Sequence, residues 1–263
     1  MAGPDLVVAN KGSLAKPEGS LTVIDAATGV LVRALASPYL KGPGDLVSSG
    51  GDVFVANTSQ SPGSVTELDP ATGQVLRTLA GGPYGFGDIL AMAVSGTDLF
   101  VAKLGSASTG SWVSEVDLAS GKPARTLLSS PLSAGPPEAM TTSGPDLFVS
   151  YRGVSHGFGG GFGSAAGGSL TEVDVTSGAT VRVVSGSRYH LGDGGAMASF
   201  GPSLYVANSD GGSVTELDIA TGALVRVLSG PGYGFATPDA LTVAGGELFL
   251  ANGSDGSVTQ LSA

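Results

Sequence analysis

Two segments of the sequence carry side chains suited to acid–base or anion-binding chemistry. The first, RYHLGDG, places Arg188, His190 and Asp193 close together, and the second is a long Gly-rich run that carries Arg152 and His156. An imidazole titrates near neutral pH and can transfer a proton, while a guanidinium can hold an anionic group. These residue types predict a candidate catalytic site formed by His190, Arg188 and His156.

Aromatic and polar residues around these segments could line a binding surface. Exposed tyrosines on loops commonly contact sugars or peptides. The alternative, which the sequence leaves open, is that these rings fill the space between neighbouring structural repeats. The candidate ligand-binding residues are Lys103, Tyr151, Arg152, Tyr189, Asp193, Tyr84 and Tyr233.

A third group consists of single acidic residues spaced along the chain, one in each of five connecting segments. Carboxylate oxygens are ligands that Ca²⁺ prefers, so these acids form a candidate calcium site. No compact loop such as D-x-[DN]-x-[DN]-G is present, no cofactor is required, and the alternative is that the acids cap loops or are solvated. The candidate metal ligands are Asp45, Asp88, Glu138 and Asp239, with Asp193 completing the series.

Composition excludes several classes of function. The 263 residues carry a net charge of −10, which argues against nucleic acid and anionic membranes as partners, and contain no Cys for disulfides or thiolate chemistry. No apolar stretch approaches the roughly 18 residues that span a bilayer. The segment MAGPDLVV lacks the features of a signal peptide, but we favour an extracellular protein whose signal has been removed over a cytoplasmic one.

All the candidate residues lie among the segments of an internal repeat. A short apolar motif recurs at intervals of 47, 46, 48, 57 and 44 residues, and a second motif of the type GSVTELD follows each copy. The first motif occupies Asp5–Asn10, Asp52–Asn57, Asp98–Lys103, Asp146–Tyr151, Ser203–Asn208 and Glu247–Asn252. The second occupies Gly19–Asp25, Gly63–Asp69, Ser111–Asp117, Gly168–Asp174, Gly212–Asp218 and Gly256–Ser262.

Two further motifs, of the types ALTVAG and ALVRVLS, complete a four-stranded unit. We label the strand types A (ALTVAG), B (the first motif), C (GSVTELD) and D (ALVRVLS), from innermost to outermost. Four short strands per repeat of this length are typical of propeller blades. The chain reads BCD, four times ABCD, then ABC. This order predicts one all-β domain over residues 1–263, a β-propeller of six antiparallel blades with almost no helix, and five blades as the alternative.

The run from Leu204 to Asn252 resembles the YVTN/NHL-type β-propeller repeats, a broad group that includes virginiamycin-lyase-like propellers. The similarity extends over the whole chain as a repeat unit. It implies the propeller fold, but it implies no single activity, because the fold hosts lyases, lactonases and binding modules. No His–Glu constellation of the lyases carries over onto this chain.

Most charged residues recur with the repeat and therefore belong to the scaffold. Each Glu on a C strand faces an Arg on the D strand, and such exposed cross-strand pairs stabilise by about 0.2–1 kcal/mol. Neutralising Glu216 and Arg226 should therefore change stability by well under about 1 kcal/mol. Nearly all the remaining charges and both histidines fall in the D–A and B–C connections, which emerge on one face of a propeller.

This distribution predicts a binding module that presents its D–A and B–C loop face, around the central channel, to a small-molecule, glycan or protein ligand. The alternative is a lyase or hydrolase that acts on a small or carbohydrate-like substrate at the channel mouth. In that case His190 or His156 is the acid or base, and Arg188 or Arg152 holds an anionic group.

Overall fold

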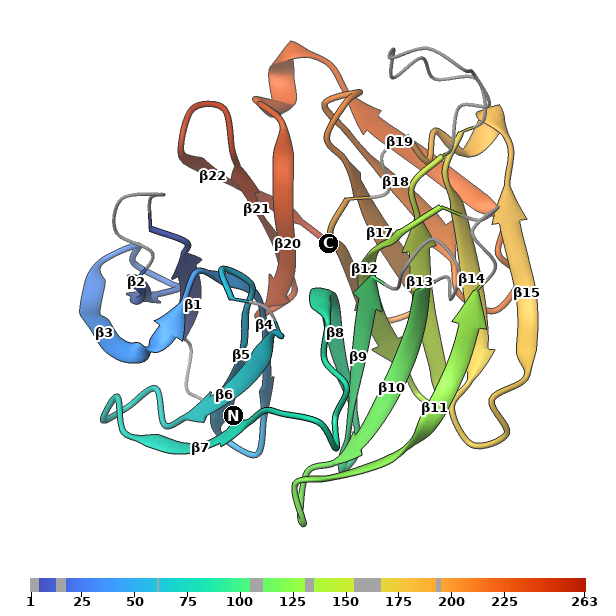
Figure 1. The fold of residues 1–263 in the computed structure, drawn as a ribbon. Helices are drawn as coiled ribbons and strands as arrows, with labels where there is room; N and C mark the ends of the chain where they lie inside the picture. Colours follow the sequence, from blue (N-terminus) through green and yellow to red (C-terminus); the bar gives the residue numbers. More distant parts are fainter. Residues whose placement is uncertain are drawn as a thin grey trace, which may run out of the picture. The chain divides into compact units, whose positions relative to one another are not determined.

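The computed structural model describes residues 5–12, 18–60, 62–104, 111–130, 135–153, 167–192 and 195–263. It is an all-β, six-bladed propeller whose blades are separate antiparallel sheets of three or four strands (Figure 1). Six blades, rather than the alternative of five, are therefore confirmed. The chain forms two compact units of three blades each, Met1–Ser129 and Ser130–Ala263.

The first unit contains blades 1 to 3, each of which follows the chain from its inner to its outer strand. Blade 1 consists of β1 (Asp5–Asn10), β2 (Glu18–Asp25) and β3 (Leu31–Lys41). Blade 2 consists of β4 (Pro43–Ser49), β5 (Asp52–Asn57), β6 (Ser64–Leu68) and β7 (Val75–Leu79). Blade 3 consists of β8 (Asp88–Ser95), β9 (Asp98–Leu104), β10 (Ser111–Asp117) and β11 (Lys122–Ser130).

The second unit contains blades 4 to 6 in the same order. Blade 4 consists of β12 (Pro137–Ser143), β13 (Asp146–Tyr151), β14 (Ser169–Asp174) and β15 (Thr180–Ser185). Blade 5 consists of β16 (Met197–Phe200), β17 (Ser203–Asn208), β18 (Ser213–Asp218) and β19 (Leu224–Ser229). Blade 6 consists of β20 (Pro238–Ala244), β21 (Glu247–Asn252) and β22 (Ser257–Ser262).

Helix is confined to single 3₁₀ turns within the described part of the chain. These are η2 (Ser187–Tyr189) and η3 (Pro231–Tyr233), both in blade-to-blade connections. No helix among the described residues has the length and hydropathy needed to cross a membrane.

The hydrophobic core lies between successive blades inside each unit. In blade 2 the B strand β5 is buried at five of its six positions, whereas the D strand β7 alternates more and less exposed positions. One cluster joins blades 2 and 3 through Phe54, Phe86 and Met92, and another joins blades 4 and 5 through Phe148, Tyr189 and Leu204. The blade-to-blade connections thus contribute rings directly to the core.

The Asp that ends each of five C strands stabilises the turn that follows, as the sequence indicated. Its carboxylate accepts a backbone N–H from two or three residues further along. Hydrogen bonds from the turn's Thr or Ser hydroxyl, and then from its backbone N–H groups, lower the pKa of Asp25, Asp69, Asp117 and Asp218.

The Glu–Arg pairs of the C and D strands are found in the expected register, but the expectation that they are exposed was wrong for three of the four acids. Glu67, Glu172 and Glu216 are buried. Arg182 of blade 4 also donates to the carbonyl of Ala220 in the β18–β19 turn of blade 5, at 2.8 Å, and Arg77 makes the corresponding bond to Leu118 in blade 3. The turn of the next blade therefore contacts the pairs of Arg77 and Arg182, which join blades as well as strands.

Candidate functional site

The connection between blades 4 and 5 carries Arg188, Tyr189 and His190, which we call the 188–190 corner. Its central residue is an anchor, because the Tyr189 ring is buried in the cluster between these blades. The Tyr189 carbonyl also accepts a hydrogen bond from the buried Thr215 hydroxyl of β18 at 2.9 Å. Arg188 and His190, on either side of this anchor, are exposed.

The equivalent tyrosines in other connections pack in a similar way. Tyr84 stacks on Phe86 with ring centroids 5.1 Å apart, and its hydroxyl donates to the Gly121 carbonyl at 2.5 Å. Tyr233 stacks on Phe235 at 5.3 Å. The pattern Tyr-x-Phe/Leu therefore recurs in these connections, and its side chains pack between neighbouring blades. This packing is the alternative to ligand binding that the sequence left open for these rings.

His190 occupies a backbone conformation that glycine adopts in two other blade-to-blade connections. Its φ is 51° and its ψ is 27°, in the left-handed region, where it ends η2. The corresponding residues are Gly85, with φ 53°, and Gly234, with φ 64°. A side chain other than glycine at such a position costs roughly 1 kcal/mol. The corner thus holds an imidazole at the expense of backbone strain.

Arg188 is held by the same anchor. Its guanidinium lies over the Tyr189 ring, 4.6 Å from the centroid, and Nη2 donates to the Tyr189 hydroxyl at 2.6 Å. This stacking restricts the guanidinium while leaving it open to solvent, which favours recognition of an anionic group.

The end of the Gly-rich loop lies against the 188–190 corner. The Gly168 N–H donates to the Leu191 carbonyl, and a Cβ on Gly168 would lie only 2.5 Å from the Gly192 carbonyl oxygen. Only glycine therefore permits this approach. Tyr151, at the other end of the loop, is buried and pairs with Ser169. His156 and Asp193 lie outside the described residues, so their distance from the corner is untested.

Most of the remaining candidates from the sequence have hydrogen-bond or ion-pair partners of their own. Arg152 forms an ion pair with Glu138 of β12, with Nε and Oε1 2.7 Å apart. Asp239 lies beside the Ser209 hydroxyl at 3.5 Å, and Asp88 is exposed at the start of β8. Asp45 accepts backbone N–H groups from Leu46, at 2.7 Å, and from Met92. Across the ranges that the structure describes, no three His, Asp or Glu side chains are grouped to hold a metal ion. Calcium binding stays a prediction.

Lys103 is buried, and its partner was not evident from the sequence. Its Nζ donates to the carbonyls of Tyr84 and Gly85 at 3.0 and 3.1 Å, and lies 5.2 Å from the Trp112 ring centroid. In four other blades the equivalent strand pair is Asn opposite Ser, whereas here Lys103 stands opposite Trp112. Burial lowers the pKa of Lys103. Lys103 and Trp112 therefore replace the Asn–Ser pair of the other blades together, as one contacting pair.

Restoring the Asn–Ser pair of the other blades should show that the effects of residues 103 and 112 on stability depend on each other. Lys103→Asn alone should lower stability by about 2 kcal/mol, because two carbonyls lose a charged donor. Adding Trp112→Ser restores the hydroxyl that the Asn amide bonds in other blades, so the double variant should be more stable than the sum of the single changes by at least about 1 kcal/mol. Urea denaturation of the four proteins measures the coupling, and strictly additive effects would contradict it.

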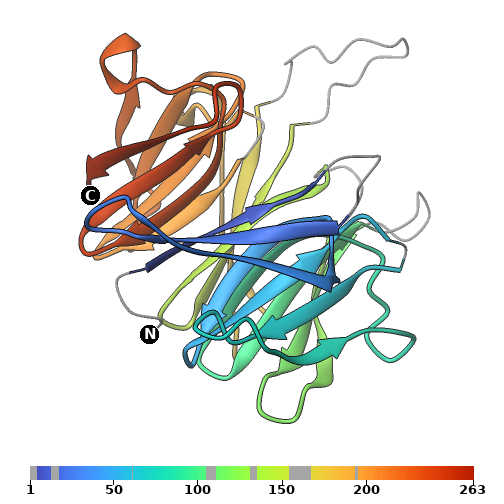
Figure 2. The ribbon, with the colours of Figure 1, turned by 90° about the vertical axis from the view of Figure 1, so that its left-hand side faces the viewer.

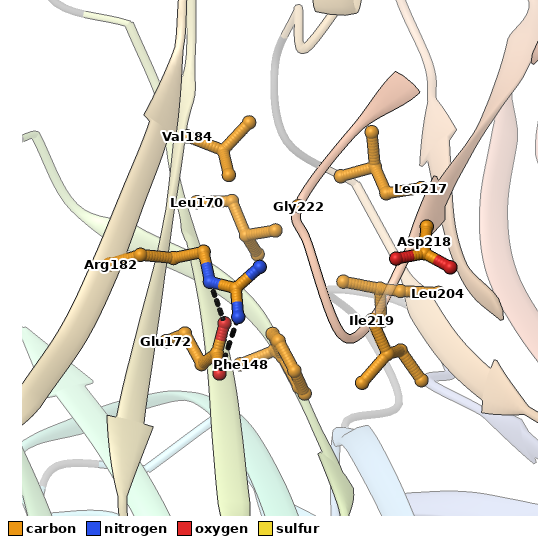
Figure 3. Close-up of a pocket in the computed structure, with 10 residues that line it drawn as sticks. All are labelled: Phe148, Leu170, Glu172, Arg182, Val184, Leu204, Leu217, Asp218, Ile219 and Gly222. Carbon is orange, nitrogen blue, oxygen red and sulfur yellow. Dashed lines mark hydrogen bonds and ion pairs between the residues drawn. The ribbon is translucent and has the colours of Figure 1, made fainter. Parts of the chain in front are cut away.

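A small open pocket lies between blades 4 and 5, away from the candidates that the sequence identified (Figure 3). Its walls are mainly apolar, and the guanidinium of Arg182 points into it beside Glu172. Arg182 Nη1 is buried there and has no hydrogen-bond partner among the described residues. The sequence pattern predicted an exposed ion pair for Arg182, so nothing in the sequence indicated this pocket.

Comparisons with known proteins support the fold without assigning a family. No family model and no curated protein matches the sequence. Among solved structures, the nidogen/laminin complex matches with a TM-score of 0.73 and 13% identity, covering 98% of this chain and 89% of that chain. Hydrazine synthase from Kuenenia stuttgartiensis matches with a TM-score of 0.61 and 16% identity, covering 93% and 89%.

A computationally designed protein, Ika8, matches with a TM-score of 0.59 and 17% identity, covering 100% of this chain and 69% of that chain. Identities this low define the class of fold alone. The chain is a six-bladed β-propeller, a fold that commonly serves as a binding module.

Proposed function

We propose that this propeller is a binding module that uses the 188–190 corner to hold an acidic side chain of a protein ligand. The observation that supports this proposal is the left-handed conformation of His190, at a position where two other blade-to-blade connections have Gly85 and Gly234. A residue that costs stability at one place in a repeat is a candidate for function rather than scaffold.

The chemistry of the corner favours a carboxylate. Arg188 supplies a charge-assisted donor, and His190 supplies a second donor that strengthens when the imidazole is protonated. The net charge of −10 disfavours a polyanion, so the ligand should present an isolated acid within a largely neutral surface. The nidogen propeller, a structural neighbour, was solved in a complex with laminin, which supports a protein ligand for this fold.

Replacing His190 by glycine should separate function from stability. His190→Gly relieves the left-handed strain and should raise the free energy of unfolding by about 0.5–1 kcal/mol. It should also weaken ligand binding at least about tenfold, the loss of one charge-assisted hydrogen bond. The ligand is first selected from an array of peptides that each carry one Asp or Glu, and binding and thermal stability are then measured together.

Two matched variants serve as controls. Gly234→His places the same side chain at the equivalent corner between blades 5 and 6, and should lower stability by about 1 kcal/mol without affecting binding. Lys122→Ala removes an exposed cation from the start of β11 and should leave binding unchanged, whereas Arg188→Ala should weaken it. Full binding by His190→Gly, or no peptide retained by the array, would refute the proposal.

A further inference from the structure

Asparagine at the end of a B strand forms hydrogen bonds to the blade-to-blade connection beside it. In blade 6 the Nδ2 of Asn252 donates to two hydroxyls of β22, and its Oδ1 accepts the Ala236 N–H at 3.1 Å. In blade 2 the Oδ1 of Asn57 accepts the Lys41 N–H at 2.9 Å. Blades 5 and 6, orange and red in Figure 2, pack side by side, so the same bonds can be compared between neighbours.

The equivalent residue of blade 5, Asn208, lacks the bond to its connection. Its Nδ2 donates to the hydroxyls of Ser213 and Thr215, at 3.3 and 3.0 Å. Because the Thr215 hydroxyl donates its own hydrogen to the Tyr189 carbonyl, it can only accept from Asn208, which fixes the orientation of the amide. Asn208 is 1% exposed, yet its Oδ1 has no hydrogen-bond partner among the described residues. A buried acceptor without a donor destabilises the arrangement in which it occurs.

Gly192 carries the N–H group that would complete this set of bonds. It follows Tyr189 by three residues, as Ala236 follows Tyr233 in the connection to blade 6. The two connections match through their 3₁₀ turns, since each tyrosine donates its backbone N–H to the glycine carbonyl three residues earlier. They differ afterwards, because the Gly192 N–H donates to the His190 carbonyl at 2.9 Å instead of to an asparagine.

The carbonyl of the same peptide group holds the end of the B–C connection of blade 4. Leu191 C=O and Gly192 N–H belong to one peptide group, and this C=O accepts the Gly168 N–H at 2.5 Å. In the connection to blade 6, the equivalent peptide group bonds the asparagine, and Gly212, the counterpart of Gly168, donates to the Ser209 carbonyl. Because a peptide group is planar, its N–H cannot turn toward the asparagine unless its C=O turns as well.

We propose that the Leu191–Gly192 peptide group is a two-position switch. In the first position, which the structure shows, its N–H bonds the His190 carbonyl and its C=O holds Gly168. In the second position, which its counterpart occupies in the connection to blade 6, the N–H bonds Asn208 Oδ1 and Gly168 is released. The switch therefore couples the B–C connection of blade 4 to the backbone of the 188–190 corner, whatever ligand the corner binds.

Relaxation dispersion of the backbone amides in the ¹⁵N-labelled full chain tests the switch without any substitution. Gly168 and Gly192 should exchange between two environments at one common rate, in the microsecond-to-millisecond range of such backbone motions. Gly212 and Ala236, their counterparts in the connection to blade 6, should show no exchange. Flat dispersion profiles at Gly168 and Gly192, or different rates at the two residues, would overturn the proposal.

Gly168→Ala should move the switch to its second position, because a Cβ there would lie 2.5 Å from the Gly192 carbonyl oxygen. The Gly192 N–H would then bond the buried Asn208, and its hydrogen exchange should slow at least about tenfold. Adding Asn208→Ser removes the acceptor and should abolish this protection. Gly63→Ala is the matched control, since its Cβ would lie 2.7 Å from the Gly87 carbonyl oxygen, and should not slow Gly192 exchange. Unchanged exchange in Gly168→Ala, or equal slowing in Gly63→Ala, contradicts the switch.

Discussion

Replacing Arg182 by alanine should lower the free energy of unfolding by about 3 kcal/mol. The guanidinium bonds Glu172 at 2.6 Å and also donates to the Ala220 carbonyl of the next blade. Glu172 is only 4% exposed, so the substitution leaves a buried carboxylate without its counterion and removes a link between blades 4 and 5. Equilibrium denaturation in urea at neutral pH measures the loss.

Arg226→Ala is the matched control, because it breaks the equivalent pair at a place where the remaining glutamate still has another hydrogen-bond donor. Glu216 keeps a hydrogen bond from the Ser203 hydroxyl at 2.7 Å, and half of the Arg226 side chain is exposed. This loss should be about 1–2 kcal/mol. Adding Glu172→Gln to Arg182→Ala should recover part of the stability, because the buried charge is then absent. Equal losses for the two arginines would show that the link between blades contributes nothing.

The Arg182 effect should also depend on pH in a defined direction. Burial already raises the pKa of Glu172 despite the nearby arginine. Without that arginine the pKa rises further, so the destabilisation should shrink as the pH falls and Glu172 takes up a proton. A loss that is constant from neutral to acidic pH would contradict the assignment of a buried carboxylate.

Asp45 should make the protein less stable as the pH rises from about 4.5 to about 7.5, by about 2 kcal/mol relative to Asp45→Asn. Burial raises the pKa of this carboxyl from 3.8 to about 6, even though the N–H groups of Met92 and Leu46 oppose the shift. Between these values the folded state binds a proton that the unfolded state has lost, so stability falls with rising pH until the folded carboxyl is ionised.

The contact between Asp45 and Met92 joins β4 of blade 2 to β8 of blade 3, so the measurement tests a link between blades as well as a titration. Unfolding free energies of the two proteins across this pH range give the difference directly. If the difference rises with pH, or stays constant, burial does not raise the pKa of Asp45, and the prediction is wrong.

The repeat made the fold predictable from the sequence. Each blade is built from local turns and period-two strands, so the Asp69-type turns, the Glu216–Arg226 register and the six B strands all leave a pattern within about 50 residues of chain. The equivalence of Tyr84, Tyr189 and Tyr233 was also visible, together with the alternative that these rings are structural. Local pattern thus determined the architecture and the division between recurring and non-recurring residues.

Tertiary structure decided what the repeat cannot encode, namely the environment between neighbouring blades. Glu172 is buried because a turn from the next blade covers it, and Lys103 is held by two carbonyls of the preceding connection and by Trp112. His190 differs from Gly85 and Gly234 only in its side chain, and its strain became evident only when the backbone angles were known. Burial and backbone conformation depend on residues brought together from different repeats, and a single blade's sequence carries no record of them.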